Sequence, residues 1–251
     1  MNTTDGFFIP DNEVKLQEEL DYSRVDDFIH SAEAFSRSTY QSVYIIDYFK
    51  QNFLYVSPNP MFLCGLTPEE MMALGYRFYL YYVPQDEQQL LLEINRAGFA
   101  FHHDLPLENR KEWCISYDFH VLNSGHPVLV NHKLTSIALT SDGRVWLGLC
   151  VVSASTHTTA GHIQMRHAGT REYFEYNLIT RRWVRKEMPL LSDAEKSMLT
   201  LSIQGYTINE IADRMCLSID TIKGYRRQIF EKLEVKNISE AIVAAVNNKL
   251  L

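Results

Sequence analysis

The chain lacks the cysteine pattern of a disulfide framework or a zinc module. Its 251 residues include four cysteines, Cys64, Cys114, Cys150 and Cys216, which are widely spaced and form no Cys-x-x-Cys pair. Neither cross-linking by disulfides nor a structural zinc site is therefore expected. We interpret all four as reduced thiols, as in a cytosolic protein.

Long hydrophobic runs are also missing. The longest apolar run, Val145 to Val152, is far shorter than the ~18 residues that indicate a membrane helix. The stretch from Met1 to Pro10 has no basic region followed by a long apolar core, so no secretion signal is expected. We predict a cytoplasmic protein with no membrane partner.

The sequence has no motif that would indicate catalysis. We find no nucleophile elbow, no glycine-rich loop that would cradle a phosphate, and no metal-ligand spacing. We therefore expect neither enzyme activity nor a metal site.

Positive charge is scarce, and its distribution is uneven. The net charge of −7 arises before Leu190, where 23 acidic residues face 16 basic ones. From Leu190 onward eight basic residues balance eight acidic ones. The acidic part is not expected to be a nucleic-acid surface, and the C-terminal part has no strong positive field, so its non-specific affinity for DNA should be modest.

The C-terminal sixty residues contain repeated helix-start signals. A capping residue precedes each expected helix, and in three of the four a glutamate follows three residues later, as in a capping box. These caps are Ser192 with Glu195, Thr207 with Glu210, Ser218, and Asn237 with Glu240. The pattern predicts four short helices between Leu191 and Leu251.

The third of these helices has a buried side and a polar side. Ile222, Ile229 and Leu233 share a narrow sector at ~100° per residue, so they should face a core. The opposite side and its flanks carry Thr221, Lys223, Gly224, Arg227, Gln228 and Glu231. Cations, an amide and a glycine that permits close backbone approach suit the major groove of DNA. Arg226 lies nearer the buried side and is expected to contact phosphate.

The fourth helix predicts self-association. The helical spacing of Ile238, Ala241, Ile242 and Ala245 predicts that these four residues are buried. The outer side of the helix presents the small or weakly polar residues Val243, Ala244 and Asn247. We interpret these three as a dimerisation surface.

Three runs carry a family resemblance: Gln204 to Ala212, Leu217 to Lys223 and Lys232 to Asn237 closely resemble the LuxR-type (FixJ/NarL-like) helix-turn-helix. The resemblance implies an all-α, four-helix, DNA-binding domain at residues 189–251 that dimerises through its last helix. The residues we predict to contact DNA are Thr207, Ser218, Thr221, Lys223, Gly224, Tyr225, Arg226 and Arg227. The sequence departs from the family at Ala194, usually arginine, at Tyr225, usually histidine, and at Glu234, usually glycine.

The region at 41–155 alternates between strand and helix patterns. Strands are expected at Val43–Tyr48, Phe53–Ser57, Glu112–Asn123, Pro127–Thr140 and Arg144–Ser153, and helices at Pro60–Leu63, Thr67–Leu74 and Pro84–Ala97. This order resembles a PAS domain, as do Asn59 to Glu70 and Pro84-Gln85-Asp86. The resemblance implies a sensory or dimerising module with an antiparallel sheet, so the whole chain should be an α+β protein.

Aromatic and histidine residues raise the question of a ligand. Trp113, Ile115, Tyr117, Phe119 and Val121 alternate with polar residues on one expected strand, and such a stripe is more often core than cofactor site. The histidines that could ligate a haem are His102, His103, His120 and His132. The neighbours His102-His103-Asp104 are expected to bind metal only weakly, because adjacent residues on a strand point to opposite faces. We predict no tightly held cofactor, with an unidentified ligand of the PAS-like domain left open.

Two segments flank this domain. Residues 1–40 have a helical pattern from Asp11 to Tyr40, which fits either a helix covering the sheet or a dimerisation or signalling helix. Residues 156–188 start as a linker and then predict strands at His162–Arg166, Glu172–Asn177 and Arg182–Lys186, the last two as a hairpin. Its Trp183 lies beside Arg181, Arg182, Arg185 and Lys186. We expect the hairpin to pack on the sensor with solvated basic edges and to couple it to the C-terminal domain; an auxiliary phosphate-binding patch is the alternative.

We expect a one-component bacterial transcription regulator that binds double-stranded DNA as a homodimer, with RNA polymerase as a further partner. A sigma-like promoter-recognition subunit is the first alternative, but it would need a helical, basic region upstream. The second is a PAS signalling module whose C-terminal helices bind protein.

Overall fold

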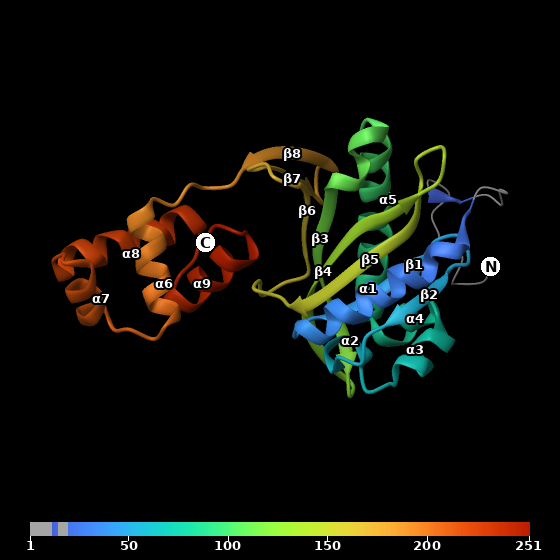
Figure 1. Ribbon diagram of the computed structural model, residues 1–251, viewed down its shortest axis with the longest axis horizontal. Coiled ribbons are helices and arrows are strands. Elements are labelled where there is room, and N and C mark those ends of the chain that lie inside the picture. The colour runs from blue at the N-terminus through green and yellow to red at the C-terminus, as the bar shows by residue number, and fades with distance from the viewer. Residues whose placement is uncertain (1–11, 15–19) are drawn as a thin grey trace. The chain divides into compact units, whose positions relative to one another are not determined.

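The computed structural model describes residues 12–14 and 20–251. In it, segments of alternating apolar and polar residues form an eight-stranded antiparallel sheet. The strands are β1 Ser42–Asp47, β2 Asn52–Val56, β3 Trp113–Asn123, β4 His126–Leu139, β5 Val145–Ala154, β6 Gly161–His167, β7 Glu172–Asn177 and β8 Arg182–Glu187. Their spatial order is β2-β1-β5-β4-β3-β6-β7-β8 (Figure 1). The expected antiparallel sheet is confirmed.

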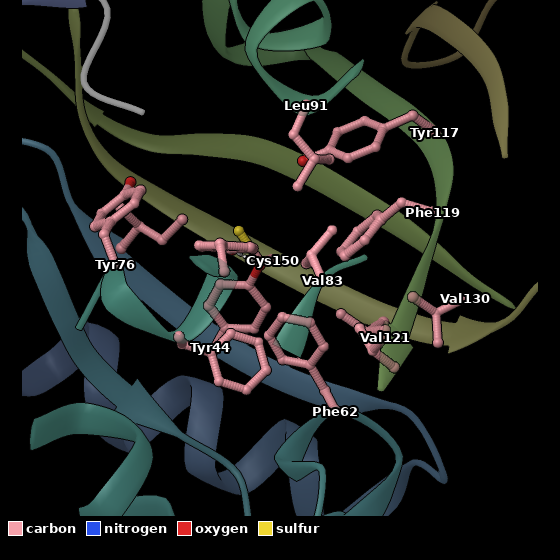
Figure 2. Packing of buried hydrophobic residues seen from close by; sticks show 14 of the residues in the cluster. Tyr44, Phe62, Tyr76, Val83, Leu91, Tyr117, Phe119, Val121, Val130 and Cys150 are labelled. Carbon is pink, nitrogen blue, oxygen red and sulfur yellow. Dashed lines mark hydrogen bonds between the residues drawn. The ribbon is translucent and has the colours of Figure 1, made fainter. Parts of the chain in front are cut away.

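Short helices between β2 and β3 cover one face of this sheet. They are α2 Pro60–Leu63, α3 Pro68–Leu74, α4 Arg77–Tyr82 and α5 Gln85–Asp104, followed by the 3-10 turn η3 Leu107–Glu112. Asn59 caps α2, and Thr67 forms a capping box with Glu70 at the start of α3. Side chains from these helices and the sheet form an aromatic core around Tyr44, Phe62 and Phe119 (Figure 2).

The opposite face of the sheet is covered by α1, Val25–Ser38, which follows the 3-10 turn η2, Tyr22–Arg24. Ala32 of α1 packs with Val43 and Ile45 of β1. The covering role proposed for the N-terminal segment therefore applies to α1. The rest of the expected helix lies partly outside the described residues, which exclude 1–11 and 15–19.

Two differences from the sequence expectation concern the helices. The short helix α4 was not predicted, and α5 continues to Asp104 instead of ending at Ala97. Gly98 permits the longer helix to pack on β3, because an added Cβ would lie 2.7 Å from Ile115 Cδ1. The assumption of a strand at His102-His103 is therefore wrong, since both residues lie in the last turn of α5.

Strands β6, β7 and β8 confirm the strands expected at 162–186 and extend the sheet beyond β3. Trp183 of β8 contacts Phe101 of α5, with ring centroids 5.0 Å apart, and lies at the same distance from Tyr176. The hairpin thus packs on α5. Its contacts with the sheet place it in the same compact unit as the preceding strands, a unit that spans Met1–Lys186.

The second unit, Glu187–Leu251, contains α6 Asp193–Ile203, α7 Ile208–Met215, α8 Ile219–Leu233 and α9 Ile238–Asn247. The capping boxes at Ser192 and Thr207 are present, and Ser218 and Asn237 cap α8 and α9. The four expected helices are therefore confirmed. Across the described parts of both units, no helix is long and apolar enough to cross a membrane.

Candidate nucleic-acid interface and sensor cavity

A tight turn joins α7 to α8. Cys216 ends α7 with a φ of 55°, in the left-handed region, and the backbone N–H of Leu217 donates to Ala212 O. Ser218 then starts α8, its hydroxyl oxygen accepting from the Thr221 N–H. The left-handed residue reverses the chain within a few residues, so α7 and α8 form a helix-turn-helix.

The buried side of α8 is fixed by Ile222 and Ile229, which lie in the core of this unit. An ion pair between the buried Glu195 carboxylate and the partly exposed Lys232 holds the helix to α6, because Lys232 Nζ lies 2.7 Å from Glu195 Oε2. Burial alone would raise the pKa of Glu195, but the hydrogen bonds from Lys232 and Ser192 outweigh it and keep that pKa below its usual value. These contacts determine which side of α8 faces solvent.

Two cationic side chains project from the exposed side of α8. The Lys223 side chain is 60% exposed and lies 3.5 Å from Asp220, and that of Arg227 is 78% exposed and lies 3.9 Å from Glu231. Exposed pairs of this kind contribute only about 0–1 kcal/mol. Both cations can therefore exchange their carboxylate partners for phosphates or base edges at little cost.

Gly224 lies between these cations along α8. A Cβ added at this position would meet no atom within 4 Å, so packing within the unit does not require a glycine here. Glycine in the middle of a helix costs about 1 kcal/mol relative to alanine. Its presence on this side suits close approach of another molecule to the helix backbone.

The other predicted contact residues have structural roles as well. Thr207 caps α7, and its hydroxyl donates to Glu210 Oε2 at 2.7 Å. Ser218 caps α8, and its hydroxyl lies 2.8 Å from that of Thr221. The structure therefore brings Thr221, Lys223, Gly224 and Arg227 onto α8 and places Thr207 at the start of α7.

Tyr225 and Arg226 are half-buried and lie nearer the core. Tyr225 packs against the hydrophobic cluster of the unit. The guanidinium carbon of Arg226 lies 5.2 Å from the centre of the Phe230 ring. Both are consequently less free to reach a base than Lys223 or Arg227, which agrees with the expected position of Arg226 at the helix edge.

The outer side of α9 is partly apolar. Val243 is exposed, and Ala244 and Asn247 are half-buried. The sequence prediction omitted Val246, whose surface is 51% exposed and which lies one helical turn from Val243. The i, i+3 spacing of the two valines is the signal that could have identified it.

In the first unit a small cavity of about 40 Å³ lies between α5 and the sheet. Its lining is mainly apolar and aromatic: Tyr48, Ile94, Asn95, Gly98, Phe99, His102, Trp113, Ile115, Tyr117, Leu134, Ser136, Val145 and Met165. The Ser136 hydroxyl meets no hydrogen-bond partner. Part of the aromatic stripe on β3 therefore lines a cavity, while Phe119 and Val121 are core.

The four histidines considered as haem ligands do not converge. His102 lines the cavity, whereas His132 lies 2.5 Å from the Tyr44 hydroxyl and His120 lies 2.5 Å from Glu87. His103 lies beside His102 in the last turn of α5. Burial lowers the pKa of His102 to about 4 and that of His132 to about 3. Both are neutral at physiological pH.

The basic residues of the hairpin are largely paired with carboxylates. Arg181 lies 3.6 Å from Glu93, Lys186 lies 2.9 Å from Glu175, and Arg185 contacts Glu172. This pairing supports solvated edges rather than a phosphate-binding patch.

Comparisons with known proteins bear mainly on the second unit. Residues 189–245 match the family described as "Bacterial regulatory proteins, luxR family". Transcriptional regulatory protein DesR of Bacillus subtilis is 44% identical over 52 residues, which cover 21% of this chain and 26% of DesR. Oxygen regulatory protein NreC of Staphylococcus haemolyticus is 23% identical over 141 residues, covering 54% of this chain and 58% of NreC. The chain thus spans less than two thirds of either relative.

Solved structures with a similar arrangement have low scores. The phage VqmA–DPO complex has a TM-score of 0.30 at 15% identity, and the aligned residues make up 90% of this chain and 89% of the chain in that structure. For a PAS domain from Colwellia psychrerythraea the TM-score is 0.36 at 13% identity, with coverage of 52% and 96%. Scores below 0.5 are too low to support conclusions about this chain.

Proposed function

We propose that this chain, whose residues 189–245 form a luxR-family regulatory domain, is a transcription regulator that reads double-stranded DNA through α8. The observation that carries the proposal is the exposed side of α8. There Lys223 and Arg227 flank a glycine that no packing contact within the unit requires. Relatives named as regulatory proteins, one of them transcriptional, support the same function.

The residues on α8 have complementary roles in this proposal. Lys223 and Arg227 contact phosphates or guanine acceptors, Thr221 contacts the backbone or a base edge, and Gly224 allows the helix to lie deep in the major groove. Thr207 and Ser218, at helix N-termini, direct backbone N–H groups toward phosphates. Tyr225 and Arg226 contact the DNA backbone at the edge of the helix.

We further propose that the regulator binds as a homodimer through α9. Eight basic residues are balanced by eight acidic ones from Leu190 onward, so a single domain has little electrostatic affinity for DNA. Two copies double the contacts. The exposed side chains of Val243 and Val246, with Ala244 and Asn247, form the pairing surface. A regulator of this kind acts in the cytoplasm, where a bacterial chromosome is found.

The first unit is proposed to be the sensor, with the domain boundary near Lys186 and Glu187. A small ligand in the cavity would contact α5 and the sheet together. The hairpin β7–β8 packs on α5 through Trp183 and leads directly to the second unit, so it is the proposed coupling element.

The proposal is tested by measuring binding of the full chain to fluorescent duplex DNA as salt is raised. For a dimer, Lys223→Ala/Arg227→Ala removes up to four cationic contacts, which should reduce the slope of log K against log salt by up to about 3.6. Arg185→Ala/Lys186→Ala removes the same charge from the hairpin and serves as a matched control. An equal change in slope for both variants would show that α8 is not the contact surface.

A further inference from the structure

Three potential metal ligands meet on the sheet face opposite the aromatic core. Asp118 lies on β3, His157 in the loop at 155–160, and His162 on β6. One ligand atom from each residue lies within 4.8 Å of the other two. Asp118 precedes His157 by 39 residues and is brought to the two histidines by the pairing of β3 with β6 and by the loop that follows β5.

A β-bulge places His162 in this group. Ser116 pairs with Gln164, but Asp118 pairs with Gly161, so β6 contains one residue more than β3 over this stretch. His162, at the bulge, has a φ of 49°, and its neighbour Ile163 points into the core. The extra residue thus directs the imidazole to the side of the sheet that carries Asp118.

The carboxylate at the centre of the group is fully buried. Asn131 Nδ2 donates to Asp118 Oδ1 at 2.8 Å, which fixes the orientation of the carboxylate. Its second oxygen, Oδ2, lies 2.5 Å from His157 Nδ1. Metal-ligating aspartates are commonly fixed in this way: one carboxylate oxygen accepts a hydrogen bond from the protein, and the other faces the imidazoles.

The two imidazoles lie face to face. The rings of His157 and His162 are parallel within 7°, with centroids 3.7 Å apart. An imidazole binds a metal through a lone pair that lies in the plane of its ring, so one of the two stacked rings must rotate before both can bind the same ion.

We propose that Asp118, His157 and His162 form a binding site for a divalent first-row transition ion, for which Zn²⁺ is the probe. Two imidazoles and one carboxylate are a ligand set that such ions take, with water at the remaining positions. Ligand atoms in a tetrahedral zinc site with bonds of about 2.0–2.1 Å lie about 3.4 Å apart. The separations of up to 4.8 Å would therefore have to shorten by up to about 1.4 Å, whereas the 2.5 Å between His157 Nδ1 and Asp118 Oδ2 would have to lengthen by about 0.9 Å.

The ion would fasten the 155–160 loop to β3 and β6. His157 supplies the one ligand from that loop, and Thr159 Oγ1 lies 3.1 Å from His162 Nε2. Bound metal should therefore stabilise the first unit. This inference is independent of the DNA-binding proposal, because all three residues lie in the first unit.

The site is tested on the full chain after removal of metal with a chelator. Titration with Zn²⁺ against a chromophoric competitor should give one equivalent per chain and raise Tm, and Co²⁺ should give visible absorption bands of a low-coordinate site. In His157→Gln/His162→Gln the stoichiometric binding, the bands and the rise in Tm should all disappear. These two side chains are exposed enough for the variant to fold.

A matched control is His120→Gln, which breaks a His–carboxylate pair on the same strand that has the same 2.5 Å contact, with Glu87. It should leave zinc binding unchanged. Asn131→Ala, which frees the Asp118 carboxylate, should weaken binding by about 10–100-fold. Less than one equivalent in the native protein, or equal losses in His120→Gln and the double variant, would overturn the proposal.

Discussion

Replacing Gly224 with alanine is expected to stabilise α8 and to weaken DNA binding at the same time. The residue lies in the interior of α8, where alanine is about 1 kcal/mol more favourable than glycine. An added Cβ meets no atom of the described residues within 4 Å, so no clash with them reduces this gain. The free energy of unfolding of the second unit should therefore rise by about 0.5–1 kcal/mol.

The effect on DNA binding has the opposite sign. If the backbone at Gly224 approaches the DNA closely, the new methyl group must be forced into a packed interface at a cost of about 1–3 kcal/mol. That cost corresponds to an increase in Kd of roughly 5- to 150-fold. A residue that served only the fold would show the gain in stability without the loss of affinity.

Both quantities can be measured on the full chain. Hydrogen exchange of the α8 amides reports the local stability, and fluorescence anisotropy with a duplex operator reports Kd. Ser197→Ala, on the exposed side of α6, also raises helix propensity and serves as the control that should not alter Kd. Unchanged affinity in Gly224→Ala would refute the close approach of α8 to DNA.

Three further predictions follow from the packing of the two units. Glu234 ends α8 with a φ of 56°, so Glu234→Gly should stabilise the second unit by about 1 kcal/mol, measured by its Tm; a lower Tm would contradict this. Lys232→Met leaves the buried Glu195 carboxylate without its cation, but the Lys232 side chain is 38% exposed, so the loss in urea unfolding should be about 1–2 kcal/mol, less than for a fully buried pair, and Glu195→Gln in the same chain should reverse it. His102 and His132 protonate near pH 6.5 when unfolded but only near pH 4 and 3 when folded, so their contribution to stability is lost as pH falls below 6.5. Urea unfolding between pH 7 and 4.5 should show a loss of up to about 1.4 kcal/mol per pH unit for each histidine, and His132→Phe should remove one such contribution; an unchanged pH slope would be inconsistent with a buried, neutral His132.

The second unit could be predicted from the sequence in detail because its signals are local. Each cap lies within three residues of the group it satisfies, and the core side of α8 follows from the spacing of Ile222 and Ile229. The residues on the opposite side were identified by the same periodicity. Val246 was missed although its i, i+3 spacing from Val243 places both valines on the exposed side of α9.

In the first unit the strands were found by alternation, whereas the helices were harder to predict. The helix α4 has no side-chain cap and its sequence, RFYLYY, is aromatic, so no local signal marks it. The helix expected to end at Ala97 continues to Asp104, and its packing at Gly98 depends on the contact with Ile115 of β3, which no local pattern reveals.

The proposed metal ligands could not be predicted from spacing. Asp118 is separated from His157 by two further strands, and the bulge that turns His162 toward it depends on the register between β3 and β6. Register of this kind is set by the packing of whole strands and leaves no short motif in the sequence.

The central claim, that α8 reads DNA sequence, is tested most directly by selecting binding sites from a pool of random duplexes with the full chain. The native protein should enrich a palindromic motif, as expected for a dimer. Lys223→Ala/Arg227→Ala should lose that enrichment, while Arg185→Ala/Lys186→Ala should keep it. The same motif recovered with the α8 variant would contradict the account.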